Sequence, residues 1–467
     1  MWWALLAALT AVRLIVAAAM PLSADEAYYW VWSRALAPGY LDHPPMVALW
    51  IWLGTALAGD TELGVRLLAP LSAAAGSAML AGIGDTLFPG RGAGLAAAAL
   101  LNATLMLAVG AVTMTPDTPL LFFWIATVGA LVRVRQDPAW WLAVGACAGL
   151  ALDSKYTAVF LGVGIVAWLA LCARDQFARW QLWAGGALAA VLFAPIVWWN
   201  AAHGWVSFLK QGGRAGDWQP ARAAAHVAEL AAGQVALATP WVAVLFGAGI
   251  VLAIRRARAG DAAWTLLAVL TVPALLVFVQ HAVGDRVQAN WPSIIYPGAA
   301  VAAAGLGWRW RGAAVVGFAI GAVVMVQATA APFIVARAYD PSLIRLAGWD
   351  RLAAKTASLA LIGRSGHQFV AAENYGLAAL LAWHTQGIAV VAVGPRWSVL
   401  ALPAAEPGNG VLLLSTRRTE PPDPAHWAEP ALMADLVRTR ADTVAETYRA
   451  YSITLRGAAV RLPERRL

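Results

Sequence analysis

The sequence is poor in cysteine and in charge, and it lacks several common catalytic motifs. Its two cysteines, Cys147 and Cys172, lie inside apolar runs, which argues against a disulfide framework and a cysteine metal site. Charged residues make up only 12% of the chain. There is no phosphate-binding glycine loop, no zinc-spaced set of histidines and cysteines, and no Gly-x-Ser-x-Gly elbow. A P-loop enzyme, a zinc-finger protein and an α/β-hydrolase are therefore excluded.

What the sequence does contain is long apolar runs. Hydrophobic residues make up 61% of the chain and its mean hydropathy is +0.66, too apolar for a soluble protein to cover its own surface. Runs of about 18–20 apolar residues are typical of transmembrane helices, and the first one favours an uncleaved span over a signal peptide. We therefore predict an all-α polytopic membrane protein with interfacial helices, one of them at 46–58. The roughly eleven transmembrane helices are expected near 2–20, 65–84, 93–113, 118–132, 139–152, 156–172, 181–199, 226–253, 262–282, 291–307 and 313–332.

Arginines gather in alternate gaps between these apolar runs. By the positive-inside rule the basic gaps face the cytoplasm, which places the acidic and aromatic motifs of the other gaps on the extracytoplasmic face. This loop topology explains the net charge of +8 better than nucleic-acid binding does. The basic gaps contain Arg91, Arg133, Arg135, Arg174, Arg179, Arg255, Arg256, Arg258, Arg309 and Arg311.

A polar and aromatic segment, SADEAYYWVWSRALAPGYLDHPP, occupies residues 23–45. Ser23 followed three residues later by Glu26 fits a capping box, so a short helix should begin near Asp25. Tyrosines and tryptophans on this helix favour the membrane–water boundary, and Pro38-Gly39 should end it. We predict an interfacial helix that holds carboxylates at the membrane surface. The alternative is that its acidic residues are solvated and that Glu26 only caps the helix.

Three further polar motifs lie in other extracytoplasmic gaps. Asp117 stands between two prolines at the start of a span, where an acidic residue is either a helix cap or functional. Lys155, in the sequence DSKYT, can snorkel to the interface or pair with Asp153. The loop WWNAAHGWVSFLKQGGR at 198–214 combines tryptophans with a few cations, as structural membrane loops often do.

The motifs DEAYYW at 25–30 and YLDHPP at 40–45 resemble the first extracytoplasmic loop of the polyprenyl-phosphate-sugar glycosyltransferases, which share the GT-C architecture. This family includes the protein O-mannosyltransferase-like proteins and the lipid A aminoarabinose transferases. TMTPDTPLLFFW, SKYT and the WN..HGW.SF loop resemble further motifs, and the resemblance covers roughly 20–300. It implies inverting transfer of a sugar from a polyprenyl phosphate, such as undecaprenyl phosphate, to a lipid, glycan or protein acceptor. The site would face the periplasm at the inner (plasma) membrane.

The resemblance also implies roles for individual residues. Asp25 would be the general base that takes the acceptor's proton, and Asp117 would orient the acceptor or assist. Lys155 and Arg214 would hold the anionic lipid phosphate. His43 stands where aminoarabinose transferases have a lysine, so a direct phosphate role is not implied there. The complete set predicted to bind substrate is Glu26, Asp42, His43, Lys155, Tyr156, His203, Lys210 and Arg214.

A metal ion and two other functions stay open at this point. Asp42, His43 and His203, together with Asp117, are candidate ligands for a divalent metal, although nothing in the sequence requires a cofactor. The main alternative function is a transporter or flippase of lipid-linked sugar. Such a protein should carry polar residues at mid-span and repeat symmetry, and this sequence shows neither. A non-catalytic assembly subunit is the third alternative. The lack of a nucleotide-sugar domain favours a lipid-borne donor.

The composition changes after Ala331. Residues 333–467 lose the long apolar runs and gain prolines and charges. We predict a transmembrane catalytic domain at 1–332 and a small extracytoplasmic α/β domain at 333–467. The alternative for the second part is a partly disordered tail. The expected strands are Phe369–Ala372, Ile388–Val393 and Val411–Leu414, with a helix at 374–384.

Overall fold

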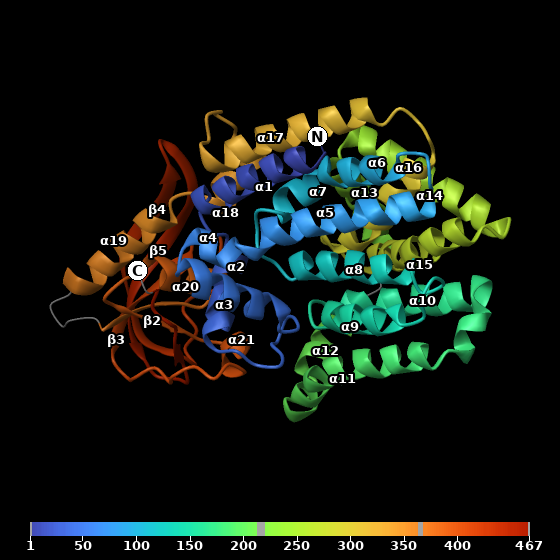
Figure 1. Ribbon diagram of the computed structural model, residues 1–467. Helices are drawn as coiled ribbons and strands as arrows, with labels where there is room; N and C mark the ends of the chain where they lie inside the picture. The colour runs from blue at the N-terminus through green and yellow to red at the C-terminus, as the bar shows by residue number, and fades with distance from the viewer. Residues whose placement is uncertain (1, 213–219, 363–367, 466–467) are drawn as a thin grey trace. The chain divides into compact units, whose positions relative to one another are not determined.

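The computed structural model describes residues 2–212, 220–362 and 368–465 (Figure 1). The chain divides into two compact units, which are described separately. The first unit holds Met1–Ile15, Asp42–Val47 and Leu68–Met325. The second holds Val16–Leu41, Ala48–Leu67 and Val326–Leu467, so the segment that carries Asp25 shares a unit with the C-terminal region. The predicted domain boundary after residue 332 stays a prediction.

Six helices in the described part of the chain are long and apolar enough to cross a membrane. They confirm the predicted multi-pass membrane protein, whereas the predicted number of eleven spans stays a prediction. These six are α1 (Trp2–Ala19), the continuous stretch Glu62–Leu87, α11 (Trp180–Ala202), α14 (Pro240–Arg258), α15 (Ala262–Gly284) and α17 (Arg311–Thr329). The stretch Glu62–Leu87 comprises α4 (Glu62–Arg66) and α5 (Leu68–Leu87).

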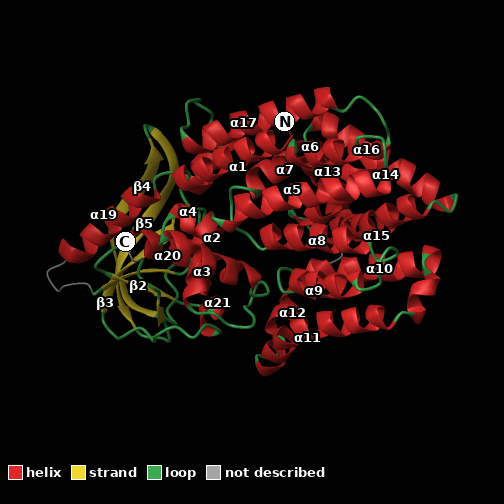
Figure 2. Cartoon of the chain, in the orientation of Figure 1, coloured by secondary structure: helices red, strands yellow, loops and turns green. Residues whose placement is uncertain are grey.

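The other helices of the first unit are shorter or more polar, and its core consists mainly of alanine, leucine and valine side chains on facing helices. Helices of both units are drawn in red in Figure 2. The remaining helices of the first unit are α6 (Ala93–Asn102), α7 (Leu105–Gly110), α8 (Asp117–Leu131), α9 (Trp140–Leu152), α10 (Val159–Cys172), α12 (Val206–Gly212), α13 (Pro220–Ala238) and α16 (Ile295–Gly305).

Two of the predicted spans are broken in the structure. The run at 226–253 is divided between α13 and α14 at Thr239, whose φ is 68°. Pro240 follows, and because a proline restricts the residue before it and cannot donate a helical hydrogen bond, it favours a break between the two helices here. The run at 93–113 becomes α6 and α7, because the side chain of Thr104 caps the start of α7.

Helices α9 and α11 approach each other closely at two glycines. A Cβ added at Gly145 would lie 2.0 Å from the carbonyl oxygen of Gly185, and one added at Gly185 would lie 2.2 Å from that of Trp141. Small residues are the usual means by which membrane helices come this close. The contact fixes α9 against α11 and thereby places the loops that follow them, which carry Lys155 and His203.

The predicted capping box is present at the start of α2 (Ala24–Arg34). The hydroxyl of Ser23 accepts the N–H of Glu26, and the Glu26 carboxylate accepts the N–H of Ser23 at 3.0 Å. The helix ends at Arg34, before the predicted stop at Pro38-Gly39, because Ala35 leaves helical geometry. Its tyrosines and tryptophans, predicted for a membrane boundary, are buried within the protein. The next helix, α3, spans Met46–Ala58 as predicted.

The C-terminal region contains a mixed sheet in the order β4-β5-β3-β1-β2-β6, which confirms the predicted α/β domain (yellow in Figure 2). β1 (Phe369–Ala372) pairs in parallel with β2 (Ala389–Ala392) and β3 (Asn409–Ser415). The antiparallel hairpin of β4 (Trp427–Arg440) and β5 (Thr443–Leu455), and β6 (Val460–Arg461), were not predicted. The helices here are α18 (Pro341–Leu346), α19 (Trp349–Ile362), α20 (Tyr375–His384) and α21 (Pro395–Ser398).

Candidate functional site

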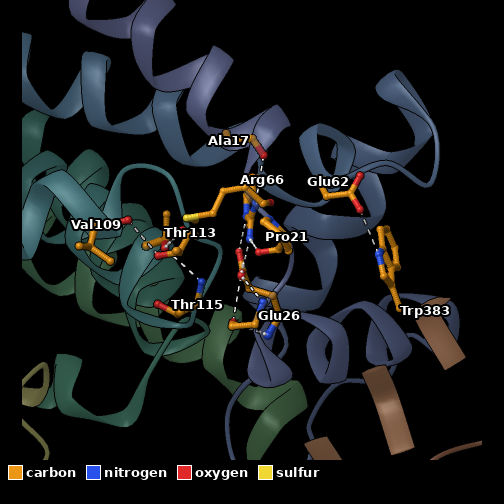
Figure 3. A network of polar contacts seen from close by, with 12 residues as sticks. Ala17, Pro21, Glu26, Glu62, Arg66, Val109, Thr113, Thr115 and Trp383 are labelled. Carbon is orange, nitrogen blue, oxygen red and sulfur yellow. Dashed lines mark hydrogen bonds and ion pairs between the residues drawn. The ribbon is translucent and has the colours of Figure 1, made fainter. Parts of the chain in front are cut away.

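The first turn of α2 carries two neighbouring carboxylates, Asp25 and Glu26. Glu26 is fully buried and faces the guanidinium of Arg66 (Figure 3). Its oxygens accept hydrogen bonds from Nε of Arg66 at 2.6 Å and from Nη2 at 2.7 Å. The same guanidinium donates to the carbonyl oxygens of Ala17 at 3.0 Å, of Pro21 at 2.8 Å, and of Met20. Glu26 therefore does more than cap its helix, because the ion pair ties α2 to the end of α1 and to α4.

Asp25, the residue before Glu26, is exposed. Successive residues of a helix are rotated by about 100°, so the two side chains leave α2 in different directions. Oδ1 of Asp25 accepts a hydrogen bond of 2.9 Å from the hydroxyl group of Tyr375, the first residue of α20. Oδ2 has no hydrogen-bond partner among the described residues. Asp25 is thus an accessible carboxylate that can accept a further hydroxyl group.

The far end of α2 and the turn before α4 are fixed by two more acidic residues. Nε1 of Trp30 donates to Oδ1 of Asp60 at 3.0 Å, and Nη1 of Arg34 lies 3.5 Å from the same oxygen. Glu62 accepts a hydrogen bond of 3.2 Å from Nε1 of Trp383 in α20 (Figure 3). These contacts join the N-terminal segments of the second unit to its C-terminal domain.

Asp117 begins α8 in the first unit, and donors surround its carboxylate. Nζ of Lys155 lies 2.8 Å from Oδ1 and 3.0 Å from Oδ2. Nδ2 of Asn290 donates to Oδ2 at 2.7 Å, and Oγ of Ser293 donates to Oδ1 at 3.1 Å. A carboxylate offers about four acceptor positions, so these contacts leave little room for a proton from an acceptor sugar or lipid. Asp117 is placed to hold Lys155.

Lys155 is buried and pairs with Asp117, which rules out the pairing with Asp153 that their closeness in sequence allowed. Oδ1 of Asp153 is shielded from solvent and has no hydrogen-bond partner among the described residues. Burial raises the pKa of this carboxyl group to about 7. The backbone carbonyl of Asp153 accepts the N–H of Met46 at 3.0 Å, which attaches the loop to the start of α3.

A pocket with mainly apolar walls opens beside Asp117. Its polar lining includes Asp117 and Ser293, so an apolar surface lies directly next to the Lys155–Asp117 pair. The walls come from α5, α6, α7 and α8. The lining residues are Ala69, Ser72, Ala73, Gly76, Ser77, Leu101, Met106, Leu107, Gly110, Thr115, Asp117, Thr118, Leu121, Phe122, Ile125 and Ser293.

A second ion pair of the first unit joins Asp42 to Lys210. Nζ of Lys210 lies 2.5 Å from Oδ1 of Asp42, and Nε2 of Gln211 donates to the backbone carbonyl of Asp42 at 2.6 Å. The structure therefore brings together two residues that were predicted to bind substrate. His43, which follows Asp42, is partly buried.

Tyr156 and His203 are held by the end of α11 and by α12. The hydroxyl groups of Tyr156 and Ser207 lie 2.7 Å apart, and Nδ2 of Asn200 is 3.5 Å from the same tyrosine hydroxyl. Nδ1 of His203 lies 2.8 Å from the carbonyl oxygen of Trp199, and the two rings stack at 4.2 Å. These contacts order the loop around Tyr156 and give His203 a structural function.

Two predicted features are not seen in the part of the chain that the structure describes. Arg214 lies outside the described residues. Among the residues that the structure describes, no group of three His, Cys, Asp or Glu side chains lies close enough together to hold a metal ion. Asp42 pairs with Lys210 instead, and His203 stacks on Trp199.

Several residues of these networks, among them Arg66, Ser293 and Tyr375, were not singled out from the sequence. Arg66 could have been found, because it lies at the edge of an apolar run and a buried charge requires a partner of opposite charge. Asn290 ends a polar gap assigned to the same face as the other motifs and Ser293 follows it, but nothing local connects them to Asp117. Tyr375 gave no signal at all, since its partner Asp25 is distant in the sequence.

Comparison with known proteins places these features in a family context. Residues 42–199 match the model of the dolichyl-phosphate-mannose-protein mannosyltransferase family. The lipid A galacturonosyltransferase RgtD of Rhizobium johnstonii is 32% identical over 182 residues. The matched region is 38% of this chain and 38% of RgtD, so the chain aligns with less than half of that relative.

Two solved structures share the fold. ArnT from Cupriavidus metallidurans bound to undecaprenyl phosphate has a TM-score of 0.62 at 14% identity, covering 97% of this chain and 98% of ArnT. The apo structure of the same protein has a TM-score of 0.60 at 16% identity and covers 97% of both chains. The chain thus shares the fold of ArnT, and residues 42–199 are similar to the mannosyltransferase family, in agreement with the resemblance to GT-C glycosyltransferases noted in the sequence.

Proposed function

We propose that the protein is an inverting glycosyltransferase that moves a sugar from a polyprenyl phosphate to a lipid acceptor. The structure of ArnT with undecaprenyl phosphate supports a polyprenyl donor, and the similarity to RgtD supports lipid A as the acceptor and galacturonic acid as the sugar. Glycan and protein acceptors are the alternatives. The comparisons give no support to the transporter alternative.

The observation that carries this proposal is the state of Asp25. It is an exposed carboxylate with one hydroxyl donor, so it can accept the proton of an acceptor hydroxyl group. The acceptor oxygen attacks the anomeric carbon from the face opposite the phosphate, and its proton passes to Asp25. The bond between the anomeric carbon and the phosphate oxygen breaks, and the electron pair leaves with the polyprenyl phosphate. The anomeric configuration is therefore inverted.

The leaving phosphate gains negative charge in this step and requires cations more than a proton donor. We assign Lys155 as the cation that contacts the leaving phosphate. Its partner Asp117 is held by Asn290 and Ser293 and lines an apolar pocket. A prenyl chain requires apolar surroundings of this kind close to its phosphate. In this proposal Asp117 orients Lys155 rather than the acceptor. Lys210 is a second cation, with Asp42 as its counter-ion.

We further propose that the reaction takes place on the periplasmic side of the inner membrane. The support is the alternation of arginine-rich gaps with motif-bearing gaps, which places Asp25, Asp117 and the C-terminal domain opposite the cytoplasmic arginines. Single cysteines introduced at Arg133 and at Ala401, the exposed residue next to the buried Leu400, would test this. A membrane-impermeant thiol reagent added to intact spheroplasts should label residue 401 and should reach residue 133 only after lysis.

The function is tested with the purified full-length protein in lipid nanodiscs. Lipid A is incubated with undecaprenyl-phosphate-linked galacturonic acid, and the lipids are analysed by mass spectrometry. We expect a lipid A species that is heavier by one galacturonosyl group, and no such species with Asp25→Asn. Transfer to lipid A by Asp25→Asn at the wild-type rate would overturn the assignment of the base. Absence of transfer by the wild-type protein would overturn this donor–acceptor pair.

A further inference from the structure

The predicted general base makes its one described side-chain contact with the C-terminal domain. From this geometry we propose that Tyr375 is a positioning residue for Asp25, so that the α/β domain is a working part of the active site. The inference rests on the proposed function, because it assumes that Asp25 takes the acceptor's proton. It goes beyond that function by assigning a residue of the C-terminal domain to the reaction.

The first turns of α2 and α20 lie in direct contact within the second unit. A Cβ added at Gly376 would stand 2.8 Å from the Cβ of Ala24, closer than two carbon atoms can approach without displacement. The missing side chain at residue 376 therefore lets the start of α20 reach the start of α2. Asn374 caps α20 by accepting the N–H of Leu377 at 3.0 Å, which fixes where the helix begins and hence where Tyr375 is placed.

The ring of Tyr375 is packed on more than one side. The guanidinium carbon of Arg396 lies 4.1 Å from the ring centroid, a cation–π distance. The ring of Tyr28 meets it edge-to-face at 4.7 Å, and Tyr28 in turn packs against Trp397 at 5.2 Å. α2 and α21 thus hold the ring in place, and the hydroxyl group is aimed at Oδ1 of Asp25 at 2.9 Å.

A hydrogen bond in this position has a geometric effect on Asp25. It restricts the torsion of the carboxylate and occupies Oδ1, so that Oδ2 is the oxygen left for the proton of the acceptor. Tyr375 keeps its own proton throughout, and the proton of the acceptor moves to Asp25. A tyrosine with only a packing function would not orient the carboxylate.

The test uses Tyr375→Phe, which removes one oxygen and leaves the ring packing in place. The matched control is Tyr339→Phe, the same change at a tyrosine of the same unit that is 81% exposed. Each full-length variant is expressed in a strain that lacks the wild-type protein, and isolated membranes are assayed over a range of donor concentrations. The readout is whichever envelope lipid disappears on deletion of the protein, so it does not require lipid A to be the acceptor.

We expect Tyr375→Phe to lower the rate per folded enzyme about tenfold, as loss of a hydrogen bond to a charged group should. The KM for the donor should stay unchanged, whereas Tyr339→Phe should match the wild type in both respects. Equal rates for the two variants would overturn the inference. A loss that follows only the amount of folded protein, or that appears in the donor KM instead of in kcat, would also overturn it. A missing lipid other than lipid A would revise the proposed acceptor and leave this comparison valid.

Discussion

The first turn of α2 and the first turn of α8 each carry an acidic residue, Asp25 and Asp117, but the two carboxylates have opposite surroundings. Asp25 on α2 is exposed and accepts one hydrogen bond from a tyrosine. Asp117 on α8 accepts hydrogen bonds from Lys155, Asn290 and Ser293. The difference shows that the position of an acidic residue at a helix start does not determine its chemistry. Its chemistry is determined by the hydrogen-bond donors that reach the carboxylate from segments distant in the sequence.

The contrast also holds between neighbours on α2. Glu26 takes over the structural task, because its buried pair with Arg66 anchors the helix, and this leaves Asp25 available for a substrate. In the first unit the cation Lys155 is buried, and its partner Asp117 lines an apolar pocket. We infer a division of labour in which α2 supplies the base and α8 holds the cation for the phosphate.

The largest expected effect is on turnover in Asp25→Asn. The amide keeps the shape of the side chain and can still accept from Tyr375, but it cannot take a proton. General-base catalysis contributes about 10²–10⁴-fold, so kcat should fall by roughly that factor while the protein folds normally. Steady-state assays with the donor in excess measure this. Asp117→Asn, measured in parallel, should lower kcat far less, and equal losses in the two variants would remove the contrast between them.

The second effect is on stability, in Glu26→Gln. Capping alone would make this change mild, since glutamine can complete a capping box. The structure predicts otherwise, because the change leaves Arg66 buried without its counter-ion, which costs about 3–5 kcal/mol in the free energy of unfolding. The apparent melting temperature of the purified protein measures this, with the exposed Glu406→Gln as the control. A Glu26→Gln protein as stable as Glu406→Gln would contradict the anchoring role.

The surroundings of Asp25 and Glu26 illustrate which features could be predicted from the sequence and which could not. The capping box, the helix at Met46–Ala58 and the strands β1 to β3 were predicted, because each depends on residues close together in the chain. The partners of Glu26 and Asp25 were not, since Arg66 and Tyr375 reach them only through the tertiary fold. Closeness in the sequence also suggested that Lys155 pairs with Asp153, whereas in the structure the lysine pairs with Asp117.

The missed elements have similar physical reasons. The hairpin β4–β5 contains Pro430 and a charged, interrupted alternation, so its strands did not show a clear period of two, and the register shifts between Ala428 and Ala431. The run at 226–253 read as one span because hydropathy does not register Pro240. The candidate site was thus predicted as a set of residues in the chain, but its pairings were not.

A smaller effect is expected on donor affinity in Lys155→Met. If the ammonium group contacts the phosphate, its loss should raise the KM for the donor about ten- to hundredfold, the value of a charge-assisted contact of roughly 1.5–3 kcal/mol. Lys155→Arg should recover part of the affinity. Donor titrations at saturating acceptor measure both. Wild-type KM in Lys155→Met would remove the lysine from the donor site and leave the Asp117 region with only a structural function.

The smallest effect distinguishes the two units by the pH dependence of their stability. Burial lowers the pKa of His384, in the second unit, to about 4, so this unit should lose stability as pH falls from about 6.5 to 4. Burial raises the pKa of Asp153, in the first unit, to about 7, so that unit should lose stability as pH rises from about 4 to 7.

Thermal unfolding of the purified protein between pH 4 and pH 8 measures these opposite trends. His384→Gln should flatten the loss on the acidic side, and Asp153→Asn should flatten the loss toward neutral pH. If either variant follows the wild-type curve throughout, the corresponding side chain is not buried in the folded protein in the way described here.

The central claim, a division of labour between α2 and α8, is tested most directly by binding of undecaprenyl phosphate to the purified variants. Tryptophan fluorescence of the protein in nanodiscs can report this binding without any turnover. We predict that Asp25→Asn binds with the wild-type Kd, whereas Lys155→Met binds about ten- to hundredfold more weakly. Weak binding by Asp25→Asn together with wild-type binding by Lys155→Met would reverse the two assignments and contradict the account.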